Sequence, residues 1–158
     1  MTLSEEELMR RAVAISADSM RAGNGGPFGA IIAREGRIIA EGSNRVTSTK
    51  DPTAHAEIVA IREACQALED FNLRGCEIYT SCEPCPMCLG AIYWARLDRV
   101  YYANTRVDAA AIGFDDDFIY REFAKDVPAR MTPFVRLDIV EARRIFDEWL
   151  SKADRIPY

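Results

Sequence analysis

The chain has 158 residues, about one domain, and this length can bury a core without disulfide bonds. Apolar residues make up 49% and charged residues 28%, with only 9 Gly and 7 Pro, which excludes a low-complexity or disordered chain. With a formal net charge of -5, the chain lacks the overall positive field that attracts phosphate backbones. This charge argues against nucleic acid as a partner.

The start of the chain carries no signal for export. Its first seven residues include three glutamates where a signal peptide needs a basic region followed by an apolar one. No later stretch approaches the roughly 18 apolar residues of a membrane span. We therefore expect the protein to stay in the cytoplasm, where five reduced cysteines favour metal binding or catalysis over disulfides.

The predicted elements alternate between helices and strands. A capping box from Ser4 to Glu7 starts the first helix, and Gly23 ends its apolar periodicity. In chain order, we expect a helix over about 4–22, strands over 28–33 and 38–40, a helix over 53–68, a strand over 77–80, a helix over 89–95, strands over 100–103 and 133–139, and a helix over 141–152. This order predicts an α/β layer arrangement in one domain over residues 1–158.

The segment "TSCEPCPMC" contains three cysteines at intervals of three residues, Cys82, Cys85 and Cys88. Cys-x-x-Cys is a common half-site for zinc, and Cys85 and Cys88 fall where a helix begins, so both would project to one side. Cys82 and Cys85 have the same spacing and form the alternative pair. An iron-sulfur cluster is disfavoured because Ile92 stands where a fourth cysteine would fall.

The chain has one histidine, His55, behind the helix-start signal of residues 51–53. If the helix that begins there and the helix that begins at the cysteines converge, His55, Cys85 and Cys88 would surround one ion, with the positive helix ends favouring the thiolates. Three protein ligands would leave the fourth tetrahedral position open, as in catalytic zinc sites. Adding Cys82 instead would give a closed structural site in a binding module.

Glu57 lies two residues after His55, so on a helix its side chain points well away from the histidine. A carboxylate beside an open zinc position can take a proton from the metal's water, whose pKa falls to about 7, and return it to a leaving group. This arrangement predicts hydrolysis.

The segments "GNGGPFGAII", "DPTAHAE", "YTSCEPCPMCLGAIYWAR" and "GFDDDFIY" together resemble the bacterial guanine deaminases of the cytidine/deoxycytidylate deaminase superfamily. The resemblance implies a three-layer cytidine-deaminase-like fold with a mixed five-stranded sheet flanked by helices. It also implies one zinc per subunit and a homodimer whose C-terminal segments, about 130–158, cross to the neighbouring site. The implied reaction is hydrolysis of guanine at C2 to xanthine and ammonia.

Carried over residue by residue, the resemblance makes His55, Cys85 and Cys88 the zinc ligands and Glu57 the catalytic proton shuttle. The residues it implies for base binding are Asn44, Phe28, Asp115 or Asp116, and Tyr158. Each has a plainer interpretation: a turn asparagine, a core aromatic, a solvated acidic run and an unordered end.

The related tRNA adenosine deaminases share the metal motif and are the nearest alternative, against which the acidic charge counts. Free cytosine or an aminated triazine remains a candidate substrate. We interpret Cys65 and Cys76 as small packed apolar residues.

Overall fold

The computed structural model describes residues 2–158, which form two compact units that divide after Tyr120. The first contains α1 (Glu5–Arg21), β1 (Gly29–Arg34), β2 (Arg37–Ser43), α2 (Val46–Thr49), α3 (Ala56–Leu68), β3 (Glu77–Cys82), α4 (Pro86–Trp94), β4 (Arg99–Asn104), α5 (Arg106–Ala111) and the start of α6 (Asp116–Phe123). The second contains the end of α6, the 3-10 helix η1 (Val127–Ala129) and α7 (Val140–Ser151). Among the described residues, no helix is both long and apolar enough to cross a membrane.

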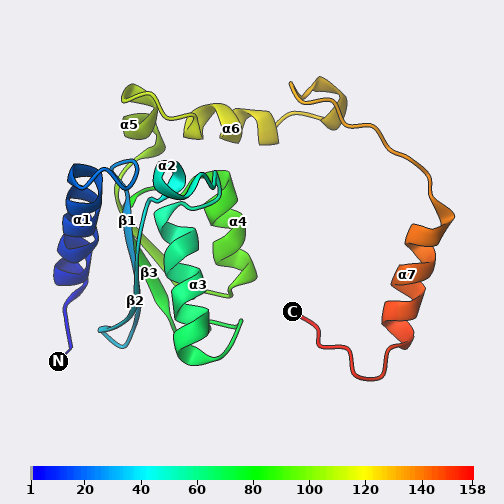
Figure 1. The fold of residues 1–158 in the computed structure, drawn as a ribbon, viewed down its shortest axis with the longest axis horizontal. Helices are drawn as coiled ribbons and strands as arrows, with labels where there is room; N and C mark the ends of the chain where they lie inside the picture. The colour runs from blue at the N-terminus through cyan, green and yellow to red at the C-terminus, as the bar shows by residue number, and fades with distance from the viewer. Residues whose placement is uncertain (1) are drawn as a thin grey trace. The chain divides into compact units, whose positions relative to one another are not determined.

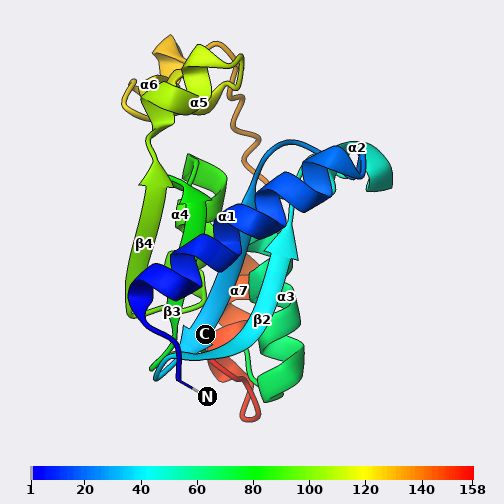
Figure 2. The ribbon, with the colours of Figure 1, turned by 90° about the vertical axis from the view of Figure 1, so that its left-hand side faces the viewer.

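The first unit is built on a mixed sheet with the strand order β2-β1-β3-β4. β1 runs antiparallel to both β2 and β3, whereas β3 and β4, joined through α4, are parallel. Helix α1 lies on one face of the sheet, and α3 and α4 lie on the other (Figures 1 and 2). The predicted α/β layer arrangement is therefore confirmed.

The central strand β1 has buried side chains on both faces of the sheet. Ala30 and Ile32 belong to the core on the α3 side, and Ile31 and Ala33 belong to the core under α1. Because neighbouring residues of a strand point to opposite faces, burial of both faces explains the unbroken apolar run in the sequence.

The predicted five-stranded sheet is wrong in its count, because the described residues form four strands. Residues 133–139, expected to be a strand, have no regular secondary structure. Their apolar side chains are exposed, Phe134 at 62% and Leu137 at 75%. A strand needs a neighbouring edge to satisfy its backbone groups, and the segment pairs with none within the described chain.

Helix starts were predicted with mixed success. The capping box at Ser4 and Glu7 is confirmed. The helix expected from Thr53 begins instead at Ala56. The helix expected to begin at the cysteines and to continue over 89–95 begins at Pro86, where a proline's missing N–H costs no helical hydrogen bond. As a result His55 and Cys85 are both N-cap residues.

Candidate active site

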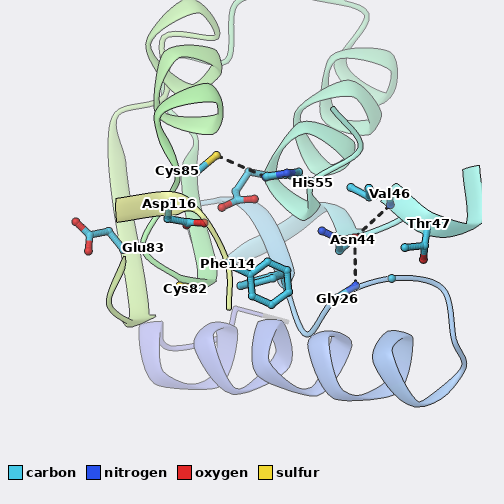
Figure 3. A pocket seen from close by; sticks show the side chains of 13 residues that line it. Gly26, Asn44, Val46, Thr47, His55, Cys82, Glu83, Cys85, Phe114 and Asp116 are labelled. Carbon is cyan, nitrogen blue, oxygen red and sulfur yellow. Dashed lines mark hydrogen bonds between the residues drawn. The ribbon is translucent and has the colours of Figure 1, made fainter. Parts of the chain in front are cut away.

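His55 and Cys85 hold equivalent positions at the starts of α3 and α4. Both N-cap residues have extended backbones, with φ and ψ of -68° and 157° for His55 and -67° and 168° for Cys85. Neither side chain caps its own helix, so both are left to turn toward each other (Figure 3). Cys88, one helical turn into α4, completes the group, as the sequence predicted.

These three side chains fit a zinc ion; we call them the His-Cys-Cys group. His55 Nδ1 lies 3.5 Å from Cys85 Sγ and 3.5 Å from Cys88 Sγ, and all three donor atoms lie within 4.8 Å of one another. A tetrahedral ion with zinc-sulfur bonds of about 2.3 Å and zinc-nitrogen bonds of about 2.0 Å would hold nitrogen and sulfur about 3.5 Å apart. The spacing is thus that of a zinc site.

The thiols of Cys82, Cys85 and Cys88 differ in the direction in which their pKa values shift. A hydrogen bond from Cys88 lowers the pKa of Cys85 to about 4, and the same bond raises the pKa of Cys88, whose proton it uses. Burial raises the pKa of Cys82 to about 12, and its Sγ lies 3.6 Å from the Thr105 carbonyl oxygen. Cys82 is therefore a neutral thiol at neutral pH, and it lies outside the metal-ligating group found among the described residues.

Glu57 lies in the first turn of α3 and is only 6% exposed. Its Oε2 lies 3.4 Å from Cys88 Sγ, and its Oε1 lies 3.3 Å from the hydroxyl of Thr80 on β3. Burial raises the pKa of this carboxyl group. The glutamate therefore points inward beside the His-Cys-Cys group rather than into solvent, as expected for a proton shuttle.

A cavity of about 460 Å³ opens beside Glu57, and Phe28, Asn44 and Asp116 are among its lining residues (Figure 3). Asn44 is buried, and its Oδ1 accepts hydrogen bonds from the backbone N–H groups of Gly26 and Val46, each at 3.2 Å. Since these two donors fix the amide orientation, Nδ2 remains as a donor. Asn44 thus both orders a turn and presents a hydrogen-bond donor at the cavity.

The acidic run at the start of α6 divides by position. Asp116 lines the cavity, and burial raises the pKa of its carboxyl group. Asp115 is exposed and is not among the lining residues. Tyr158 belongs to the C-terminal unit, and its contact with a base stays a prediction.

Sequence reasoning missed several residues of the cavity and its surroundings. Phe114 packs edge-on against Phe28, with ring centroids 4.8 Å apart, and its only sequence signal was its place beside the acidic run. Thr80 had none, because a threonine in a short strand is ordinary. The other lining residues without a predicted role are Gly25, Gly26, Val46, Thr47 and Glu83.

The similarity of this chain to known proteins extends over nearly its whole length. Residues 3–104 match the cytidine and deoxycytidylate deaminase zinc-binding region, which confirms the predicted zinc cofactor. Across 156 residues the chain is 50% identical to the guanine deaminase of Bacillus subtilis, covering 99% of this chain and 100% of that one. The crystal structure of guanine deaminase from Bacillus subtilis matches with a TM-score of 0.95 over 99% of both chains.

More distant relatives match less of the chain. The tRNA-specific adenosine deaminase of Aquifex aeolicus is 49% identical over 49% of this chain and 51% of its own length. The structure of a guanine deaminase from Nitrosomonas europaea is 34% identical, with a TM-score of 0.69 over 73% of this chain and 67% of that one. The described fold, the His-Cys-Cys group and these similarities together show that the chain belongs to the zinc-binding cytidine and deoxycytidylate deaminase family.

Proposed function

We propose that this chain hydrolyses guanine to xanthine and ammonia in the cavity beside Glu57. The observation that carries the proposal is the pairing of a donor, Asn44 Nδ2, with an acceptor, Asp116, around one cavity. Guanine suits this pair, because its O6 and N7 accept hydrogen bonds whereas its N1–H and amino group donate them. Adenine has an amino group in place of O6 and carries no proton on N1. The full-length similarity to a guanine deaminase supports the same choice.

In the proposed reaction, His55, Cys85 and Cys88 would hold zinc, which makes a water acidic enough to attack at neutral pH. The water's oxygen bonds to C2 of guanine, and the bond from C2 to the exocyclic nitrogen breaks. Glu57 carries the two protons of that water, one to ring nitrogen N3 and one to the departing amine, which leaves as ammonia. Asn44 and Asp116 would hold the base in register, with Phe28 against its ring.

The main alternative is deamination of an adenosine in tRNA. The tRNA-specific relatives match 48% to 72% of this chain, whereas the guanine deaminase match covers 99% of it. The net charge of -5 also disfavours a phosphate backbone as ligand. Both observations favour a free base.

The decisive experiment measures ammonia release by the zinc-loaded protein from guanine, adenine, cytosine, an aminated triazine and a short tRNA stem-loop. We expect guanine to react fastest. If guanine is inert while another substrate reacts, the substrate assignment is wrong.

In the same assay, Glu57→Gln should lower kcat about 100- to 10,000-fold, because glutamine keeps the shape but cannot carry the protons. Zinc content should stay at the wild-type level. Glu63→Gln, an exposed change on the same helix, is the matched control and should keep full activity. Normal activity of Glu57→Gln would contradict the proposed proton shuttle.

We also propose that the chain is one deaminase domain that works as a homodimer, with the C-terminal segment of about 130–158 exchanged between subunits and Tyr158 closing over the partner's base. Among residues 121–158, all described, none is buried. The exposed side chains of α7 include large apolar ones: Ile145, Phe146, Trp149 and Leu150. Leaving such a surface in water costs about 25 cal/mol per Å², which a second subunit would recover.

A further inference from the structure

Tyr120 makes a hydrogen bond that the reaction itself does not use. Its hydroxyl donates to the carbonyl oxygen of Pro84 at 2.6 Å. Pro84 immediately precedes Cys85 of the His-Cys-Cys group, whereas Tyr120 lies in α6, the helix that begins with Asp116. One hydroxyl therefore joins the helix of the proposed base-binding carboxylate to the turn that presents a metal ligand.

The partners of Tyr120 are themselves held in place. The guanidinium of Arg106 lies 4.4 Å from the centre of the Tyr120 ring. The backbone N–H of Arg106 donates to Glu83 Oε2 at 2.8 Å, and the backbone N–H of Glu83 donates to the Asn104 carbonyl at 2.7 Å. Tyr120 thus contacts two segments that hydrogen bonds already fix to each other.

Helix α6 needs such contacts to hold its position. It has eight residues, none of them buried, and isolated helices below about 12 residues are marginal in water. Gly113, which precedes it, has φ of +94°, and the backbone hydrogen bonds that tie the connection to α5 end at Phe114, before the helix begins. Phe114 contacts Phe28 just before the helix begins, and Tyr120 contacts Pro84 within it.

Asp116 lies between these two anchors. It precedes Tyr120 by four residues, so both side chains lie on the same face of α6. Because Asp116 lines the cavity, a small rotation or fraying of this short helix would move its carboxylate away from a bound base.

We propose that Tyr120 is a positioning residue for substrate recognition: its hydroxyl, bonded to Pro84, holds α6 so that Asp116 stays in the base-binding cavity. This inference rests on the proposed function of Asp116. Without the hydroxyl, a larger fraction of molecules would have Asp116 displaced, and apparent affinity falls in proportion to the competent fraction. At saturation the reaction would proceed as before.

Tyr120→Phe removes only the hydroxyl. For the zinc-loaded full-length enzyme we expect KM for guanine to rise about fivefold, the value of one neutral hydrogen bond, with kcat and zinc content unchanged. The matched control is Tyr101→Phe, whose hydroxyl donates to Glu5 at 2.6 Å and does not line the cavity; its KM should stay at the wild-type value. An unchanged KM in Tyr120→Phe, or a loss of kcat together with zinc, would overturn the proposal.

A double-mutant cycle tests whether Tyr120 acts through Asp116. In an Asp116→Asn background, Tyr120→Phe should raise KM no further, because the group that it positions is already gone. An additive effect would show that Tyr120 acts elsewhere.

Hydrogen exchange gives a readout that does not depend on the substrate. In Tyr120→Phe the backbone amides of α6 should exchange about fivefold faster, whereas those of α3 should not change. If guanine is not the substrate, faster exchange in α6 alone still supports the anchor, and unchanged exchange overturns it.

Discussion

Thr80 is a buried side chain outside the cavity lining that contacts Glu57, the proposed proton shuttle. Its hydroxyl, in a residue 1% exposed, lies 3.0 Å from the Cys82 carbonyl oxygen and 3.3 Å from Glu57 Oε1. Cys88 contacts the other carboxyl oxygen, so Glu57 is held on both sides. Two such contacts restrict the rotation of a buried carboxyl group, which otherwise has a broad terminal torsion. Thr80 and Cys88 therefore fix the plane of the Glu57 carboxyl group, which the proposed proton shuttle requires.

We expect Thr80→Val, which keeps the shape and removes the hydroxyl, to lower kcat about tenfold, the value of a hydrogen bond to a charged group. KM and zinc content should remain at their wild-type values, because the change touches neither the base nor the ligands. Thr80→Ser, which keeps the hydroxyl, should restore most of the activity. Steady-state kinetics and metal analysis check this prediction, and equal losses in the valine and serine variants would contradict it.

At the scale of whole elements, the contact between β2 and α3 places two functional residues at once. A Cβ atom added at Gly42 would come within 2.2 Å of the Ala56 carbonyl oxygen and 2.6 Å of the Ala60 nitrogen. Only a glycine lets the strand approach α3 this closely. Since His55 and Glu57 lie at the start of α3, this close approach also fixes the metal site relative to the sheet.

Gly42→Ala should therefore push α3 away from the sheet, lower the free energy of unfolding by about 1–3 kcal/mol, and reduce zinc occupancy. Gly29→Ala is the matched control, because its Cβ would come within 2.3 Å of the Ala12 carbonyl oxygen on α1, which carries no metal ligand. It should destabilise the protein to a similar degree yet retain zinc. Denaturant unfolding and metal analysis distinguish the two, and equal zinc loss in both would disprove the link.

Elements with a local signal could be predicted, and contacts between distant segments could not. The capping box at Ser4 marks a helix start within four residues, and the spacing of His55 and Glu57 is likewise local. Thr80 meets Glu57 only because β3 lies against α3, which no short pattern encodes. The strand predicted over residues 133–139 is wrong for the opposite reason. Its apolar residues suit a strand, but a strand forms only where the edge of another strand is available for pairing.

For the molecule as a whole, the C-terminal unit is notable for large apolar side chains that the described chain does not bury. Its side chains Phe146 and Leu150 are 77% and 66% exposed, on a helix whose Arg144 lies on the opposite face. The first unit also exposes large aromatics, Tyr93 at 70% and Trp94 at 63%. Surfaces of this kind are typical of subunit interfaces, which supports the proposed homodimer.

Subunit mixing tests the proposed exchange directly. A Glu57→Gln subunit would lack the proton shuttle but carry an intact C-terminal segment, and a Tyr158→Ala subunit would have the reverse defect. If the segments cross, each mixed dimer contains one site with both groups intact and one with neither. Random 1:1 mixing makes about half of the dimers mixed, so activity should recover to about a quarter of the wild-type value, although each parent is impaired. Without exchange no site in a mixed dimer gains both groups, and activity should stay at the mean of the two parents.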